Sequence, residues 1–133
     1  MVQVEGKYIL DKNENFKEYL IHIGIPEAIA FLAESFGKKL KISVDGKKYT
    51  FDDGSKPSVI VLDEEYDEPI EFKKIVLKSI AKLEGNKIIV TSKNGDEDAG
   101  TRIHEFTDTG YIVTLTHAGV TGKRYFKRKE LNK

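Results

Sequence analysis

Cysteine is absent from this sequence of 133 residues, which excludes both a disulfide framework and a thiolate metal site. No apolar run approaches the roughly 18 residues that a membrane-spanning helix needs. Neither sign of charge dominates, with 22 basic and 22 acidic residues, so strong non-specific attraction to nucleic acid is not expected. The first six residues lack the charged-then-apolar layout of a secretory signal, and we therefore expect a cytoplasmic protein.

Apolar residues make up 39% of the chain and charged residues 33%, a balance typical of a soluble globular protein. This length suits one domain and leaves little room for two. We therefore expect residues 1–133 to form a single domain, since no linker, low-complexity segment or internal repeat interrupts them.

Residues that tolerate positive φ recur at even intervals and predict a series of tight turns. The turns are expected at Asp45-Gly46, Asp53-Gly54, Glu84-Gly85-Asn86, Asn94-Gly95 and Thr109-Gly110. Between them lie short runs of strand composition: 40–44, 49–51, 58–62, 75–83, 87–92, 101–106, 111–117 and 123–126. Short strands at a spacing of roughly 8–12 residues predict an all-β fold, either an antiparallel sandwich or a barrel.

One stretch near the start breaks this pattern and predicts a helical hairpin. A helical stripe of apolar residues runs over 15–23 and ends at Gly24. Pro26 suits the first turn of a second helix over 26–36, with Gly37 as its end. We expect both helices to cover one end of the barrel. The second helix is broadly apolar, as is typical of a lid that touches a ligand or a membrane surface.

A DNA-reading helix-turn-helix is the first alternative for this hairpin. Its second helix would have to present basic or amide side chains to base edges, but its only charged residues are Glu27 and Glu34. The basic run 123–129 is another candidate for a nucleic-acid site, but strand alternation would divide its charges between two faces. We therefore expect no nucleic-acid partner.

Several segments, in order along nearly the whole chain, match a family pattern. They are Gly6-Lys7-Tyr8-Ile9-Leu10, Glu14 to Leu20 with Ile23-Gly24, Glu65-Tyr66-Asp67-Glu68, Leu77-Lys78-Ser79-Ile80, Leu83-Glu84-Gly85-Asn86-Lys87, Thr114-Leu115-Thr116-His117 and Arg124. Together they resemble the intracellular lipid-binding proteins, which include the fatty-acid-binding proteins and the cellular retinoid-binding proteins.

The resemblance implies an all-β, ten-stranded antiparallel up-and-down β-barrel of the lipocalin-like (calycin) type, capped by a helix-turn-helix lid. It also implies a water-containing cavity that binds one hydrophobic ligand. Two regions depart from the family pattern: the turn through 52–57 is a few residues shorter and the segment 69–74 slightly longer. Both flank the portal in the family, so ligand access and selectivity can differ here.

A fatty acid that enters a barrel loses the hydration of its carboxylate, at a cost of several kcal/mol unless a partner charge replaces it. The resemblance implies two inward arginines and a tyrosine for this purpose. An ungapped alignment of the C-terminal part places His104, Arg124 and Phe126 at these three positions. One of the three carboxylate-binding residues is therefore retained.

Arg102 is a candidate replacement for the missing arginine. It lies two residues before His104, so the two side chains share one face of a strand. A guanidinium is permanently charged and binds a carboxylate through two N–H groups, so Arg102 and Arg124 can together hold an acid. The alternative is that Arg102 points to solvent and His104 is an ordinary polar group of the cavity.

The same alternation predicts which apolar side chains face inward. On the strands these are Leu40, Ile42, Val44, Tyr49, Phe51, Ile60, Leu62, Ile88, Val90, Val113 and Leu115, and in the lid they are Phe16, Ile23, Ile29 and Phe31. These residues can form either a cavity wall or a solid core. The resemblance, and not the alternation, favours a cavity.

The function predicted from these features is carriage of one long-chain fatty acid, or a similar amphipathic acid, by a monomer that touches membranes transiently through its lid. One alternative is a bulkier ligand such as a retinoid, a bile acid or a sterol. Another is an interaction module that delivers cargo to a partner protein.

An enzyme is not expected, because the sequence has no cysteine nucleophile, no Gly-x-Ser-x-Gly motif and no phosphate-binding glycine loop. The three histidines, His22, His104 and His117, lack metal-ligand spacing, so no metal and no cofactor are predicted. A chance metal or haem contact between His104 and His117 is left open, since the alignment places them on neighbouring strands.

Overall fold

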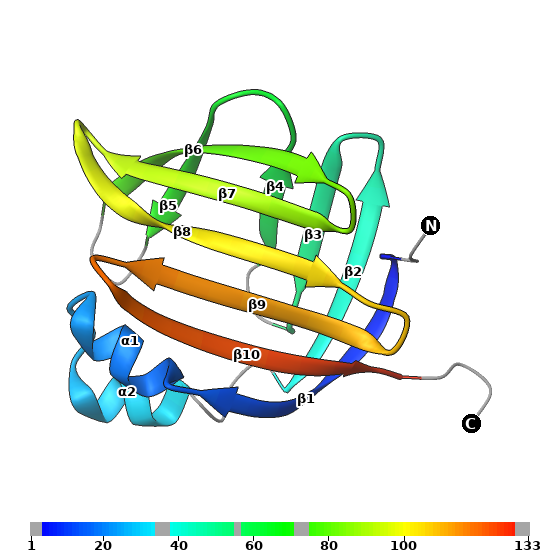
Figure 1. Ribbon diagram of the computed structural model, residues 1–133, viewed down its shortest axis with the longest axis horizontal. Helices are drawn as coiled ribbons and strands as arrows, with labels where there is room; N and C mark the ends of the chain where they lie inside the picture. Colours follow the sequence, from blue (N-terminus) through cyan, green and yellow to red (C-terminus); the bar gives the residue numbers. More distant parts are fainter. Residues whose placement is uncertain (1–3, 34–37, 55–56, 71–74, 130–133) are drawn as a thin grey trace.

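The computed structural model describes residues 4–33, 38–54, 57–70 and 75–129, and within them ten strands form one antiparallel sheet (Figure 1). The strands are β1 (Gly6–Glu14), β2 (Lys39–Asp45), β3 (Lys48–Asp52), β4 (Ser58–Val61), β5 (Tyr66–Ile70), β6 (Ile75–Glu84), β7 (Lys87–Asn94), β8 (Glu97–Phe106), β9 (Gly110–His117) and β10 (Val120–Arg128). Sequence neighbours pair except for β4 and β5, and β1 pairs with β10 to bring the two ends of the chain together. A seam between β4 and β5 is bridged by Leu62 and Ala81. The predicted ten-stranded up-and-down barrel is confirmed.

Alternation of side chains builds the wall of this barrel. In β6 the inward residues Leu77, Ser79 and Ala81 are buried while their neighbours are exposed, as the two-residue period of a strand requires. Two-residue turns join β2 to β3 and β6 to β7, and their first residues, Gly46 and Gly85, have φ of 60° and 62°. Glycine adopts this left-handed conformation without steric cost, which is why these predicted turns form.

Two strands, β1 and β5, lie outside the runs that the sequence pattern predicts. β1 carries charged residues and a register shift between Leu10 and Lys12, so its alternation is broken. β5 contains Pro69 and lies at the edge of the sheet, where the missing backbone donor of proline is tolerated. Both strands form because they pair with neighbouring strands of the sheet, although their own sequences lack the alternating pattern that predicts a strand.

Two short helices, α1 (Phe16–His22) and α2 (Glu27–Ala33), cover one end of the barrel beside β10 (Figure 1). The predicted end of the second helix, through Phe36 and Gly37, lies outside the described residues. α1 approaches β10 closely at Gly122, where a Cβ atom would lie 2.9 Å from the Cβ atom of Tyr19. Neither helix, and no other in the described ranges, is long and apolar enough for a membrane span.

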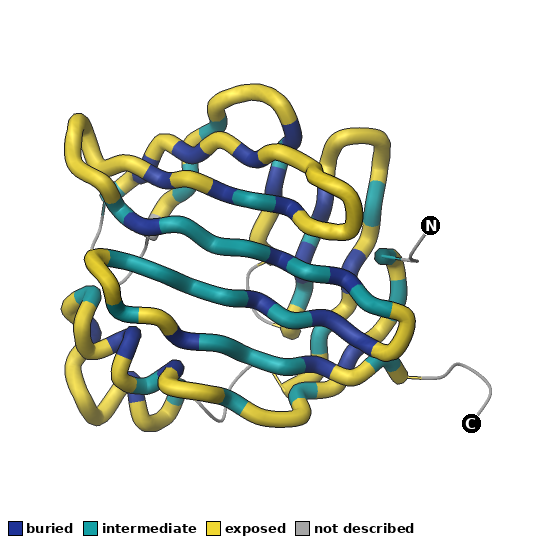
Figure 2. The backbone as a smooth tube through the Cα atoms, viewed as in Figure 1, coloured by how far each residue is buried: buried dark blue, intermediate teal, exposed yellow. Residues whose placement is uncertain are grey.

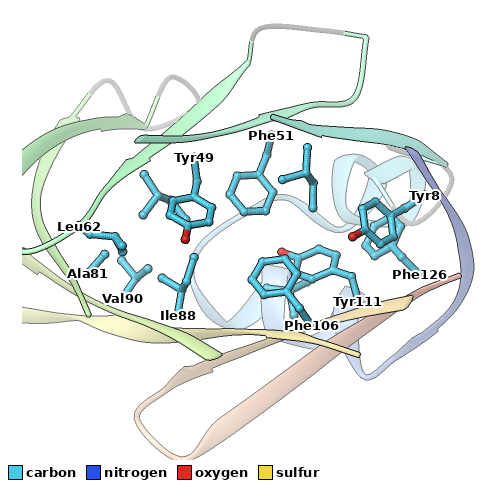
Figure 3. Packing of buried hydrophobic residues seen from close by; sticks show 13 residues of the cluster. Tyr8, Tyr49, Phe51, Leu62, Ala81, Ile88, Val90, Phe106, Tyr111 and Phe126 are labelled. Atoms are coloured by element: carbon cyan, nitrogen blue, oxygen red, sulfur yellow. The ribbon is translucent and has the colours of Figure 1, made fainter. Parts of the chain in front are cut away.

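The inner face of the barrel holds a hydrophobic core (Figures 2 and 3). Its buried members are Tyr8, Ile42, Tyr49, Phe51, Ile60, Leu62, Ala81, Ile88, Val90, Phe106, Tyr111, Val113 and Phe126. Leu40, Val44 and Leu115 pack against this cluster and are partly buried. The inward orientation predicted for the strand residues is therefore confirmed. A second cluster lies under the lid and contains Phe16, Tyr19, Leu20, Ile25 and Ala30.

Candidate ligand-binding site

A hollow of about 500 Å³ lies between the lid helix α1 and the inner faces of strands β5 to β9. This volume is within the range of about 300–1,000 Å³ that is usual for small-molecule sites. The lid contributes Phe16, Tyr19, Leu20, His22 and Ile23, and the strands and their turns contribute Glu68, Ile75, Leu77, Ser92, Asn94, Glu97, Asp98, Ala99, Gly100, Arg102, Leu115 and His117. The lid side of the wall is mostly apolar, and all the acidic residues and the arginine of the wall lie on the strand side.

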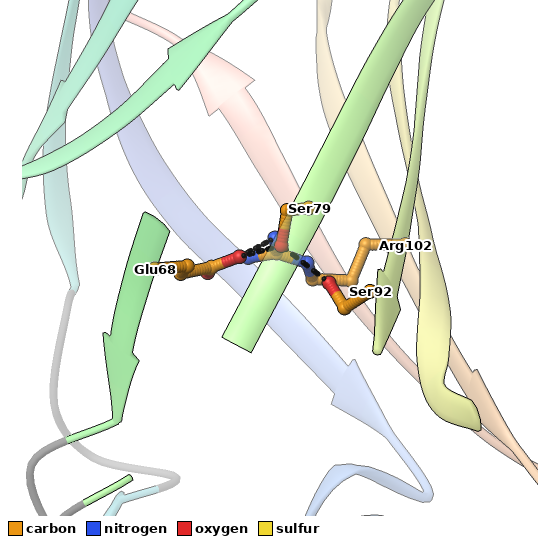
Figure 4. Close-up of polar contacts among 4 residues, drawn as sticks. All are labelled: Glu68, Ser79, Ser92 and Arg102. Atoms are coloured by element: carbon orange, nitrogen blue, oxygen red, sulfur yellow. Dashed lines mark hydrogen bonds and ion pairs between the residues drawn. The ribbon is translucent and has the colours of Figure 1, made fainter. Parts of the chain in front are cut away.

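The polar wall is organised around Arg102, which faces inward as the alternation predicts. Its guanidinium forms an ion pair with Glu68 of β5, at 2.5 Å between Nη2 and Oε1 (Figure 4). Ser79 donates from its hydroxyl to the same Glu68 oxygen at 2.8 Å and lies 2.8 Å from the hydroxyl of Ser92. The side chains of Arg102 and Glu68 are only 21% and 16% exposed, so this ion pair is largely shielded from water.

His104 and Tyr111 form a buried pair on neighbouring strands. Nδ1 of His104 is hydrogen-bonded to the hydroxyl of Tyr111, and the two rings are stacked. Burial, and secondarily the positive charge of Arg102, lower the pKa of His104 to about 3, so the imidazole is neutral at pH 7. Its other ring nitrogen, Nε2, is buried and has no hydrogen-bond partner among the described residues.

Arg124 lies on the inward face of β10, two residues before the buried Phe126. Its Nε donates to the side-chain oxygen of Asn13 at 2.8 Å. The guanidinium lies 4.5 Å from the ring centroid of Phe16 and 5.6 Å from that of Phe126, within the range of a cation–π contact. The second predicted arginine thus sits between the lid and the aromatic core.

Tyr111 connects the two arginines. Burial raises the pKa of its phenol, and the positive charges of Arg102 and Arg124 oppose that rise, so both guanidinium groups act on the same hydroxyl. Tyr111 pairs in register with Phe126 across β9 and β10, and the rings of these two residues are stacked. Arg102, His104, Tyr111, Arg124 and Phe126 therefore form one connected cluster, which we call the anchor cluster.

Of the apolar residues predicted for the cavity and portal, Phe16 and Leu115 line the hollow, and Ile23 does so as well. Leu40, Ile42, Phe51, Ile60, Leu62, Val90 and Val113 belong to or pack against the core cluster instead. Contact of those residues with a ligand stays a prediction. The hollow therefore lies at the lid end of the barrel. At the end away from the lid, the inward side chains of opposite walls pack against each other and fill the interior.

The lid residues Ile29 and Phe31 differ from the expectation that they face the cavity. Their side chains are 53% and 62% exposed and point to solvent. α2 buries Ala30 alone among its described residues, and residues on either side of it are rotated by about 100° around the helix axis. α2 therefore presents its large apolar side chains, Ile29 and Phe31, to solvent and turns the small side chain of Ala30 toward the interior.

Glu68, Tyr111 and Asn13 are polar residues of the site that the sequence reasoning did not select. The signal for Tyr111 was present, because it lies two residues before the inward Val113 on the same strand. Glu68 carried no such signal, since its contact with Arg102 depends on the order of the strands from β5 to β8 in the folded sheet. His104 and His117 lie on the neighbouring strands β8 and β9, as the alignment predicts. Their side chains have different partners, because His104 pairs with Tyr111 while His117 contacts His22.

No protein-family model matches the chain. Comparison with individual proteins finds fatty acid-binding proteins that match it over nearly their whole length. A fatty acid-binding protein of Tyrophagus putrescentiae is 37% identical over 97% of this chain and 100% of its own. A fatty acid-binding protein of Lepidoglyphus destructor is 33% identical over 96% and 99%. The crystal structure of a fatty acid-binding protein from brain tissue of Drosophila melanogaster superposes with a TM-score of 0.79 at 35% identity, covering 93% and 98% of the two chains.

Proposed function

The chain belongs to the intracellular lipid-binding proteins, the family of the fatty-acid-binding proteins, and from this we propose that it carries one long-chain fatty acid with the carboxylate against Arg124. The observation that carries the proposal is the inward guanidinium of Arg124, which lies 4.5 Å from the ring centroid of Phe16, a residue that lines the hollow beneath the lid. In this arrangement the acyl chain lies along Phe16, Leu20 and Leu115, and the head group reaches the anchor cluster.

The aromatic surroundings of Arg124 support its role as the carboxylate partner. The guanidinium carbon lies over the rings of Phe16 and Phe126, and the N–H donors of a guanidinium point outward in its own plane. Two parallel N–H groups in that plane match the two oxygens of a carboxylate. An ionised acid can therefore be held while the rings keep the guanidinium in position.

Arg102 plays a different part in this proposal, although the sequence suggested it as a second carboxylate partner. Its charge is already paired with Glu68, so a second carboxylate at the same guanidinium would meet the negative charge of Glu68. We assign Arg102 and Glu68 to the polar wall of the hollow, where their ion pair links β5 to β8 across the inner face of β6 and β7.

His104 and Tyr111 complete the head-group end. His104 is neutral, so it provides hydrogen bonding without charge, and its buried Nε2 faces no described partner. Phe126 stands where the family has a tyrosine, and Tyr111 on the adjacent strand supplies a hydroxyl in its place. The fatty-acid carboxylate thus lies beside a fixed positive charge and a neutral polar pair.

The outer face of the lid fits brief contact with membranes. Ile29, Phe31 and Leu32 of α2 are each more than half exposed, and the ammonium group of Lys17 lies 6.0 Å from the Phe31 ring centroid. Apolar side chains next to a lysine favour an anionic lipid surface. We include in the proposal that the protein acts in the cytoplasm as a monomer without catalytic activity.

The proposal is tested by titrating the delipidated protein with a fluorescent fatty acid and, separately, with retinol. We expect one fatty acid per chain. In Arg124→Ala, oleate binding should weaken by about 10- to 100-fold, because a hydrogen bond to a charged group contributes about 1.5–3 kcal/mol.

Oleyl alcohol, which carries no charge, should lose less than about threefold in the same variant. The matched control is Lys127→Ala, which removes one positive charge from the outer face of the same strand and should leave oleate binding unchanged. Equal losses for oleate and oleyl alcohol, or tight binding of retinol alone, would show that Arg124 does not hold a carboxylate.

A further inference from the structure

Two histidines that are 95 residues apart in the sequence meet at the rim of the hollow. His22 is the last residue of the lid helix α1, and His117 is the last residue of β9. Nε2 of His22 lies 3.1 Å from Nδ1 of His117, and the ring centroids are 5.2 Å apart with a tilt of 49°. Neither residue belongs to the anchor cluster, so the carriage of an acid does not account for the pair.

A third contact fixes the proton on His117. Its Nε2 lies 3.2 Å from the backbone carbonyl oxygen of Asp98, and a carbonyl oxygen can only accept a hydrogen bond. Nε2 of His117 therefore carries the proton and donates to Asp98. In the neutral ring this leaves Nδ1 with a lone pair that points toward His22, which donates to it from its own Nε2.

We propose that His22 and His117 form a binding site for one divalent metal ion of the zinc and copper class. Imidazole nitrogen is a preferred ligand of these ions, and the bond from zinc to a histidine nitrogen is about 2.0–2.1 Å. With bonds of this length, two nitrogens 3.1 Å apart subtend an angle of about 98° at the metal. A tetrahedral angle needs a separation of about 3.3 Å, so the two nitrogens have to move apart by only about 0.2 Å, and the rings have to turn until both lone pairs point at the metal.

The surroundings of His117 match those of a metal ligand. Histidines that bind metals usually donate their other ring N–H to a carbonyl or a carboxylate, which fixes the tautomer, and the carbonyl of Asp98 does this here. When the metal binds, the proton on Nε2 of His22 moves to its Nδ1 by exchange with solvent. Both ligands are then neutral imidazoles, as coordination requires.

The protein supplies two ligands to this site. Among the described residues no group of three histidine, cysteine or acidic side chains is placed to hold a metal, so water completes the coordination. Because His22 belongs to the lid and His117 to the barrel wall, the bound metal links α1 to β9. The consequence is a lid that opens less readily in the presence of the metal.

The test is calorimetric titration of the full chain with Zn²⁺, comparing the wild type with His22→Gln and His117→Gln. We expect one saturable equivalent in the wild type. Removal of a residue that merely orients a metal ligand costs about 10- to 100-fold in affinity, so each variant should lose at least about 100-fold. Cu²⁺ should bind more tightly than Zn²⁺ to the same site. His104 is retained in every variant and therefore serves as an internal control.

Hydrogen exchange supplies an independent measurement, because a metal that links the two elements should slow exchange at the α1 amides of the wild type and of neither variant. Both side chains lie at the surface, so the variants are expected to fold. The proposal is overturned if the wild type shows no saturable binding at millimolar Zn²⁺. It is also overturned if either variant keeps the affinity of the wild type, since the metal would then sit on carboxylates such as Glu97.

Discussion

His104 makes the stability of this protein depend on pH in a predictable direction. Burial and the charge of Arg102 lower its pKa in the folded state to about 3, against about 6.5 in an unfolded chain. Between these two values the unfolded chain binds one proton more than the folded protein. The free energy of unfolding therefore falls as the pH falls, by about 1.4 kcal/mol per pH unit. This contribution is complete above about pH 6.5 and is lost progressively toward pH 3.

From pH 7.5 to pH 4.5 the loss that His104 causes amounts to about 2.7 kcal/mol. The assay is urea unfolding at both values for the wild type and for His104→Gln, whose amide can still bond Tyr111 but does not titrate. The variant should lose about 2–3 kcal/mol less than the wild type on acidification. The two proteins share every other residue, so all other contributions cancel in the comparison. Equal losses in the two proteins would refute the conclusion that His104 is buried in its neutral form.

Two further predictions concern the polar wall and the lid. Glu68→Gln removes the carboxylate beside Arg102 and should lower the free energy of unfolding by about 1–3 kcal/mol. The control Asp67→Asn breaks a fully exposed pair with Lys78 and should leave that free energy nearly unchanged. Similar costs of the two variants in urea unfolding would contradict the difference in burial. Gly122→Ala places a methyl group 2.9 Å from Tyr19 and should cost about 1–3 kcal/mol. A neutral result at Gly122 in thermal unfolding would mean that α1 lies farther from β10.

The inward faces of the strands were predictable because the two-residue period of a strand is a local property. Arg102 faces the interior together with His104, as their spacing requires. The partner of Arg102 was not predictable in the same way. Glu68 reaches it along the inner face of the sheet, past Ser79 of β6 and Ser92 of β7 (Figure 4). No local sequence pattern encodes a contact between strands that are not neighbours.

The position of the hollow could not be predicted from the sequence pattern either. Leu115 and Val113 alternate in the same way on β9, yet Leu115 lines the hollow and Val113 lies in the core. The difference depends on how closely the opposite wall approaches, which is set by the packing of all the strands. In the lid, the apolar character of Ile29 and Phe31 could not reveal that α2 presents them to solvent.

Carbon-13 NMR of bound oleate, labelled at its carboxyl carbon, tests most directly whether the fatty-acid carboxylate meets Arg124. An ionised carboxylate paired with a guanidinium has a lowered pKa. We therefore predict a single bound resonance at one equivalent whose chemical shift does not change between pH 8 and pH 5, and which titrates in this range in Arg124→Ala. A bound resonance that titrates alike in the wild type and the variant, or no bound resonance at all, would contradict the account.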